Sequence, residues 1–112
     1  MHLKLKTAFK KEMLKAKALY TNNEYEQSFY HLERAHILGQ RSYLPHVLSH
    51  WWMLKVGWKT RDFKEVFGQL LRIVGSAGSI VGVVPIGNTG GANVSPTKPM
   101  PIPDDLIQYF NE

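Results

Sequence analysis

Hydrophobic residues recur every three or four positions along most of the chain before residue 75. This spacing is typical of amphipathic helices, and it predicts helices over residues 4–20, 24–38, 44–59 and 63–74. Short polar stretches that contain Asn, Gly, Ser, Thr or Asp separate these segments, and such residues commonly end or cap helices. The pattern therefore predicts an all-α protein.

Single residues mark where these helices start and stop. Asn23 followed by Glu26 resembles a capping box for the second helix. Gly39 is expected to end the second helix, because glycine is the residue most often found in a left-handed C-terminal cap. Ser42 and Pro45 are typical of the start of the third helix.

Two hydrophobic stripes are expected to face the core. The stripe on the first helix is flanked by lysines and consists of Leu5, Phe9, Met13, Ala16 and Tyr20. The stripe on the third helix consists of Val47, Trp51, Leu54 and Trp58. On this view the neighbouring stripe of the third helix lies at the edge of the core; it consists of His46, His50, Met53 and Gly57.

An internal repeat relates the two halves of the helical region. A shift of 38 positions places Phe29 on Phe67 and Leu32 on Leu70. Both units read as helix, polar turn, aromatic residue and helix, which is similar to the tetratricopeptide repeat. We therefore expect two tetratricopeptide-like hairpins, at about 4–38 and 44–74, with both leucines buried in equivalent positions. Such arrays usually contain more than two units, so either the C-terminal segment or a second subunit should cover the open ends.

The composition changes at Pro85. Residues 85–95 are rich in Gly and Asn, and prolines alternate with hydrophobic residues up to position 103. A last short helix is predicted over 106–110. We expect residues 85–112 to form an irregular strap that packs on a helical domain of residues 1–84 and buries Ile102 and Leu106.

Charge and composition exclude several classes of protein. The chain has 112 residues, no cysteine and a net charge of +5, and residues 1–21 alone hold six lysines and one glutamate, again a net of +5. No nucleic-acid recognition motif accompanies this basic segment. Membrane contact through its amphipathic helix is less favoured than a helix that faces the core. With no signal peptide and no spanning segment recognised, a cytoplasmic protein is expected.

The histidines offer the most specific chemistry in the sequence. His46 and His50 are four positions apart and share a helix face, as do Glu33 and His36 at three positions. If the second and third helices are antiparallel, these four side chains converge across one turn. The spacing therefore predicts a site for zinc, nickel, copper or iron between the two helices, because imidazole and carboxylate groups bind such ions.

Two further residues are weaker candidates for this site. Met53 would add a soft thioether ligand, which favours copper(I). His31 lies on a different side of the second helix from His36 and is not expected to share the same ion.

Other functions fit the same residues. The histidines could be structural in a helical adaptor that binds a partner protein, or another copy of itself, through its repeat faces. Alternatively, a metal with an open coordination position could hydrolyse a substrate with Glu33 as base. No nucleophile with a complete triad is visible, so a non-enzymatic binding protein is preferred to an enzyme.

The glycine-rich loop is a candidate anion site. Successive backbone amides can form a nest for a phosphate or carboxylate. The residues concerned are Gly87, Asn88, Thr89, Gly90, Gly91 and Asn93. Their residue types serve equally well for turns with positive φ angles, and the lysine and helix of a P-loop are not recognised.

Several motifs together resemble the domain-of-unknown-function 3703 family of small bacterial proteins. They follow one another in order at residues 31–40 (HLERAHILGQ), 50–58 (HWWMLKVGW), 68–72 (GQLLR), 87–95 (GNTGGANVS) and 99–103 (PMPIP). The family supplies no established activity. The resemblance implies that the histidine segment and the glycine loop are hallmarks of the family, but it does not assign their roles. If the chain holds a metal, a role in metal homeostasis or resistance is expected.

Overall fold

The computed structural model describes residues 2–76 and 86–110. Its helices are α1 (Leu3–Thr21), α2 (Tyr25–Gly39), α3 (Tyr43–Lys59), α4 (Phe63–Gly75) and the short α5 (Asp104–Ile107). A turn of 3₁₀ helix, η2 (Gln108–Phe110), follows α5. The predicted all-α class is confirmed, and the four long helices match the predicted segments to within two residues at each end.

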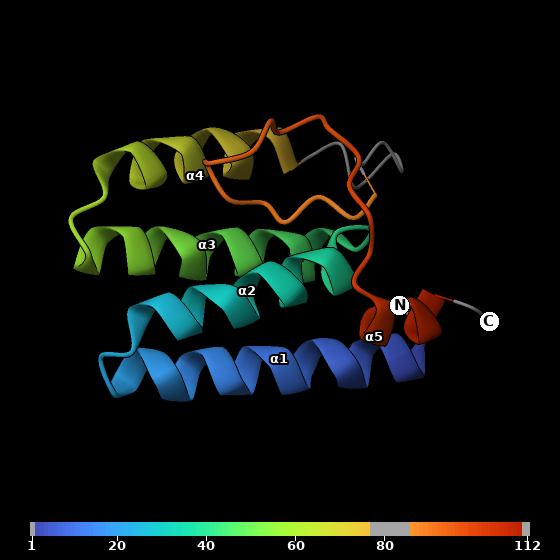
Figure 1. Cartoon of the computed structure of the whole chain (residues 1–112). Helices are drawn as coiled ribbons and strands as arrows, with labels where there is room; N and C mark the ends of the chain where they lie inside the picture. Colours follow the sequence, from blue (N-terminus) through green and yellow to red (C-terminus); the bar gives the residue numbers. More distant parts are fainter. Residues whose placement is uncertain (1, 77–85, 111–112) are drawn as a thin grey trace.

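The four long helices form two antiparallel hairpins that stack side by side (Figure 1). α1 packs on α2, α2 on α3, and α3 on α4. The segment 86–103 runs past α4 and α3 and then turns towards the start of α1, where α5 and η2 lie (Figure 1). This arrangement places α4 at one end of the stack and the C-terminal helices next to α1.

The core forms mainly between α1, α2 and α3. The predicted stripe of α1 faces inward, with Phe9, Met13 and Ala16 buried. It meets Leu32 of α2 and Met53 of α3 in one cluster of buried side chains. None of the helices among the described residues has the length and hydrophobicity needed to cross a membrane.

The C-terminal segment contributes directly to this core. Leu106 is 2% exposed and belongs to the buried cluster, and Ile102 packs against it, as predicted. Arg34 joins three elements, because its guanidinium pairs with Glu12 of α1 and with Asp105 of α5. The predicted boundary between residues 84 and 85 lies outside the described residues.

The prediction of which face of α3 packs in the core is wrong. Trp51 and Trp58 are 49% and 63% exposed, whereas His46 and His50 are buried. The histidine stripe thus lies in the core, whereas the hydrophobic stripe is half-buried at Val47 and Leu54 and exposed at both tryptophans. The reason is that the buried side of α3 meets α2 and α4. Gln69 of α4 accepts a hydrogen bond from His50, and the ring of His46 packs against that of His36 on α2.

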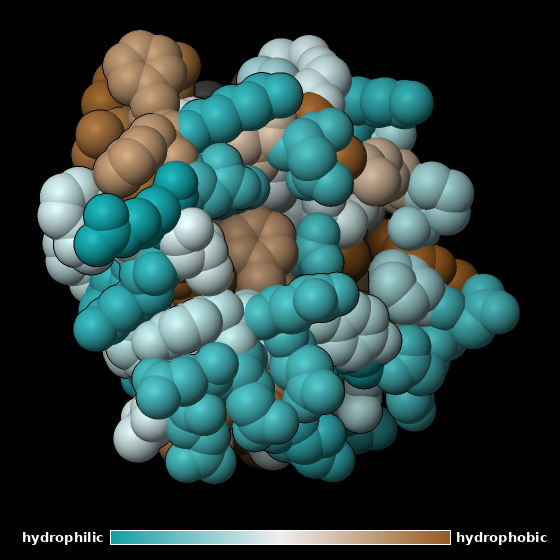
Figure 2. Space-filling model, turned by 60° about the vertical axis from the view of Figure 1, so that its left-hand side comes forward, coloured by the Kyte–Doolittle hydropathy of each residue, from teal (hydrophilic) through white to brown (hydrophobic). Residues whose placement is uncertain are grey.

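The predicted equivalence of Leu32 and Leu70 is also wrong. Leu32 is fully buried, but Leu70 is 49% exposed. Leu32 lies on a helix with neighbours on both sides, whereas α4 ends the stack, and within residues 2–76 and 86–110 no helix packs on its outer side. Figure 2 shows hydrophobic residues gathered on the surface at the level of α4.

Two predicted helix ends also differ from the structure. Asn23 has a φ of 62° and Glu24 occupies the N-cap of α2 without a side-chain hydrogen bond, so no capping box forms. Gly39 is the last residue of α2 and is not left-handed. It is small because a Cβ there would lie 2.8 Å from Cβ of Pro45 and 2.9 Å from the ring of Phe9.

Candidate metal centre

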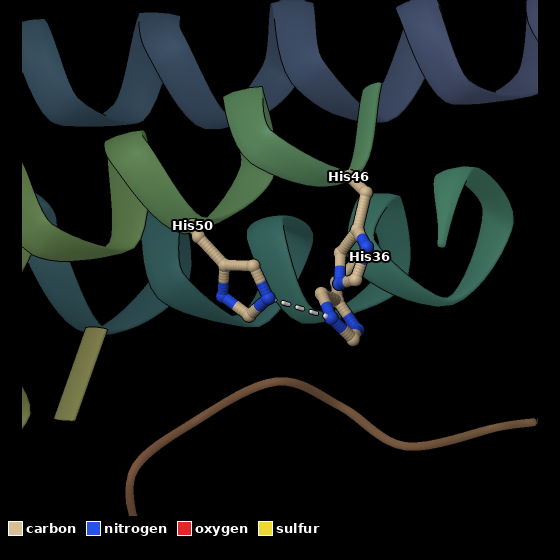
Figure 3. A group of neighbouring side chains, drawn as sticks. All are labelled: His36, His46 and His50. Atoms are coloured by element: carbon tan, nitrogen blue, oxygen red, sulfur yellow. Dashed lines mark hydrogen bonds between the residues drawn. The ribbon is translucent and has the colours of Figure 1, made fainter. Parts of the chain in front are cut away.

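The turn between α2 and α3 brings three histidines together. His36 lies in the last turn of α2, and His46 and His50 lie in the first two turns of α3. The three rings point towards one another (Figure 3), and their centroids are 4.5 to 4.9 Å apart. One nitrogen from each ring lies within 4.8 Å of the other two. The predicted convergence of these three histidines is therefore observed.

The hydrogen bond of His36 decides which of its nitrogens is free. Nδ1 of His36 lies 2.7 Å from the backbone oxygen of Asn88. A carbonyl oxygen can only accept, so Nδ1 carries the proton and donates it. In the neutral ring Nε2 then has an open lone pair.

Gln69 of α4 acts on His50 in the same way. Its Oε1 lies 2.6 Å from Nδ1 of His50. The orientation of the amide is defined, because Nε2 of Gln69 donates to Gly90 O at 2.8 Å and to the Glu65 carboxylate at 2.6 Å. Both partners only accept, so the amide oxygen faces His50 and Nδ1 of His50 must be the donor. His50 therefore also has an open lone pair on Nε2.

These two lone pairs face each other. The Nε2 atoms of His36 and His50 are 3.1 Å apart, along the dashed line in Figure 3. Neither neutral ring has a proton to place between them. Metal–nitrogen bonds of about 2.0–2.1 Å at tetrahedral angles would set the two nitrogens about 3.3 Å apart, close to the observed separation.

Burial keeps the three rings neutral. It lowers the pKa of His50 to about 3 and that of His46 to about 4. The pKa of His36 also falls well below its usual value, chiefly because of burial and then because of the neighbouring His50 and His46. Neutral imidazole is the form that binds metal ions.

His46 completes the group with an unused polar atom. The residue is 8% exposed, and its buried Nδ1 has no hydrogen-bond partner among the described residues. A buried polar atom without a partner is costly, so it needs an explanation. A ligand held by the three rings supplies one.

Residues 87–91 close over His36. Gly90 has a φ of +85°, and a Cβ there would lie 2.6 Å from Cδ2 of the His36 ring, so only glycine fits. The side chain of Asn88 holds the loop in shape: its Oδ1 accepts from Gly90 N, and its Nδ2 donates to the backbone oxygens of Ser95 and Lys98. The loop thereby presents its carbonyl oxygens to His36 and Gln69.

The other predicted ligands lie elsewhere. Glu33 is not part of the histidine group. It lines a cavity of about 530 Å³ together with Glu65, and burial followed by the charge of Glu65 raises its pKa to about 7. His31 pairs with Glu12 of α1 at 2.7 Å. The sulfur of Met53 accepts from the Gln69 amide at 3.4 Å, so it contacts the residue that orients His50.

Backbone amides of the predicted anion loop bind acceptors of the protein itself. Gly87 N donates to Gln40, Gly90 N to Asn88, and Ala92 N to the carboxylate of Glu65. These bonds explain the shape of the loop without an anion. Anion binding at this loop stays a prediction.

The spacing of polar residues on α4 could have predicted which residues support the site. Glu65, Gln69 and Arg72 are spaced by four and three positions and form one polar face of α4. That face turns inward: Gln69 is fully buried, and Arg72 donates to the backbone oxygens of Gly68 and Val94. A polar face on an otherwise hydrophobic helix would have indicated a buried polar network.

Fold and site together define a small all-α protein with a buried histidine triad at a helical turn. The family model described as "Protein of unknown function (DUF3703)" matches residues 3–110, so the chain belongs to that family. No curated protein and no solved structure matches the chain. The function must therefore be argued from the site itself.

Proposed function

We propose that this protein binds a transition metal ion through His36, His46 and His50, as a binding protein rather than an enzyme. The observation that carries the proposal is the 3.1 Å approach of two Nε2 atoms whose rings both donate through Nδ1. Two lone pairs in such contact repel each other, and a bound cation turns that repulsion into coordination.

The hydrogen bonds around the triad have the form found at metal sites. Histidine ligands commonly donate their second N–H to a carbonyl or carboxylate oxygen, which fixes the ring and its tautomer. Asn88 O and Gln69 Oε1 occupy these positions. An interaction adaptor with purely structural histidines has no need for two lone pairs that face each other.

The donor set favours ions of intermediate softness. Three neutral imidazoles suit zinc, nickel, copper or iron, and the chain has no cysteine to offer a thiolate. Three protein ligands leave one coordination position for a water or another small ligand. Holding an ion in this way fits a role in metal homeostasis or resistance.

Zinc and nickel ions provide the direct test. Added to metal-free protein at neutral pH, either ion should raise the melting temperature, because a ligand that binds only the folded state stabilises it. The double variant His46→Ala/His50→Ala should lose this gain. His31→Ala is the matched control, since His31 pairs with Glu12 away from the triad, and it should keep most of the gain.

Equal thermal shifts in the wild type and the double variant would contradict the proposal. They would place the ions on surface groups and leave the triad as a structural feature. Elemental analysis of protein purified without an affinity tag should show one metal ion per chain in the wild type and less in the double variant.

A further inference from the structure

The outer side of the α3–α4 hairpin carries large hydrophobic side chains that are 46% to 81% exposed. From α3 these are Leu44, Leu48, Trp51 and Trp58. From α4 they are Phe63, Phe67, Leu70, Leu71 and Val74. The rings of Trp58 and Phe63 touch, with centroids 6.1 Å apart, so the two sets meet in one α3–α4 apolar face.

The histidine network explains why α4 turns these residues outward. Gln69 bonds to His50, Glu65 bonds to Gln69 and to Ala92, and Arg72 bonds to Val94. The polar side of α4 is thus required inside the protein. Its hydrophobic side must then face away from the core, and in the described part of the chain no helix packs there.

The spacing on this face suits packing against other helices. The α4 residues Phe63, Phe67, Leu70 and Val74 follow one another at steps of four, three and four. Leu44, Leu48 and Trp51 of α3 keep the same steps. Alternation of four and three is the heptad pattern of helices that pack side chains into one another's gaps.

The one charged residue between Trp51 and Trp58 in this pattern does not interrupt the face. Lys55 occupies the next heptad position, but its ammonium lies 3.8 Å from the centroid of the Trp52 ring and 5.3 Å from that of Tyr20. Both contacts draw the charge towards α1. Apart from Lys55, the stripe of α3 is hydrophobic from Leu44 to Trp58.

The other end of the helix stack is already covered. Leu106 of α5 is buried in the core, and Tyr109 and Phe110 of η2 pack against it beside α1. The C-terminal segment, which was expected to cover an open end of the helix stack, thus covers the end formed by α1. Among the described residues, no segment covers the outer side of α4 in the same way.

The size of the face matches what a stable dimer needs. Such interfaces bury about 800 Å² on each partner. Aromatic side chains bury roughly 150–250 Å² each when fully covered. Two tryptophans and two phenylalanines about half exposed or more, together with five aliphatic side chains, supply an area of that order.

We propose that a second copy of this chain covers the α3–α4 apolar face and forms a dimer with twofold symmetry. A twofold axis sets identical patches against each other. Two antiparallel hairpins with the same heptad steps can then pack as a four-helix bundle. The histidine triad lies on the opposite side of α4 from this face, so the dimer does not depend on metal binding.

The molar mass of the full chain in solution tests the proposal. Light scattering coupled to size exclusion should give twice the mass of one chain for the wild type. Phe67→Glu places a charge in the middle of the face and should give the mass of one chain. Leu14→Glu is the matched control, because Leu14 is 69% exposed on α1, outside the face, and it should stay dimeric.

Two further measurements keep the result decisive. Circular dichroism should show unchanged helix content in Phe67→Glu, and Val74→Glu should repeat its effect, since Val74 is 81% exposed and its replacement leaves the core intact. A wild type with the mass of one chain at every concentration tested would overturn the proposal. So would a Phe67→Glu variant that stays dimeric. If the monomeric wild type then floated with vesicles of phosphatidylglycerol, a lipid surface would be the occupant instead.

Discussion

Gln69 links the histidine triad to the rest of the protein. It is fully buried, and its amide contacts His50, Glu65, Gly90 and the sulfur of Met53. Its two N–H groups can donate to Glu65 and Gly90 in only one orientation, with the amide oxygen towards His50. A single side chain therefore selects the tautomer of His50, and through it the nitrogen that is offered to a metal ion.

Replacing this glutamine should weaken metal binding without removing a ligand. We expect Gln69→Ala to lower the affinity for zinc about 10- to 100-fold, the usual effect of losing a residue that orients a ligand. Gln27→Ala is the control, because Gln27 is exposed on α2. Competition with a chromophoric zinc chelator measures both affinities. Equal affinities in Gln69→Ala and the wild type would show that Gln69 does not orient His50.

Among the elements, α5 depends most on its surroundings. It has four residues, too few for a helix that is stable by itself. Leu106 anchors it in the core, and Asp105 pairs with Arg34, which also contacts Glu12. The C-terminal segment thus stays in place through one buried leucine and a small ionic network.

The leucine should account for most of this attachment. Leu106→Ala should lower the free energy of unfolding by about 2–5 kcal/mol, the range for truncating a buried leucine. The neighbouring Ile107 is 41% exposed. Ile107→Ala should therefore change the free energy of unfolding by no more than about 0.5 kcal/mol. Denaturant titration gives both values. Similar losses for the two variants would mean that α5 packs with another face.

For the whole molecule, burial of the triad makes stability depend on pH. The pKa values of His46 and His50 in the folded protein are about 4 and about 3, whereas an unfolded histidine titrates at about 6.5. Between these values the unfolded chain binds more protons than the folded chain. The three buried histidines therefore lower the stability of the metal-free protein as the pH drops, and they outnumber Glu33, whose raised pKa of about 7 acts in the opposite direction.

This loss should be visible in the thermal stability of the protein. We expect the melting temperature of metal-free protein to fall between about pH 6.5 and pH 4, where unfolded histidines take up protons and the buried ones do not. The double variant His46→Gln/His50→Gln lacks both groups and should show a shallower decline. Scanning calorimetry across this range measures both curves. Parallel curves would show that the histidines are not the groups that titrate.

The sequence by itself predicted the helices and much of the site. Hydrophobic spacing located the four long helices, because amphipathic periodicity reflects local backbone geometry. An antiparallel turn between the second and third helices was expected to bring His36, His46 and His50 together, and the structure shows these three side chains in one group. Here the prediction worked because a short turn between antiparallel helices leaves little freedom in which residues meet.

Glu33 marks the limit of that reasoning. It shares a helical face with His36 in the sequence, yet it lines a cavity with Glu65. Three positions on a helix correspond to a rotation of about 300°, so a residue there points some 60° away from its partner. The distance between α2 and α3 then decides which side chain reaches the group, and that distance depends on packing.

What the sequence determined by itself was therefore the set of helices and which residues share each face. What only the tertiary structure decided was which face turns inward. Trp51 and Phe67 lie on hydrophobic stripes and are exposed, whereas His50 and Gln69 are polar and buried. Periodicity records that a helix has two unlike sides. It does not show that residues 86–103 bring carbonyl oxygens and amides to α2 and α4, or that Gln69 of α4 then bonds to His50 of α3. These contacts make the polar sides the ones that the core can satisfy.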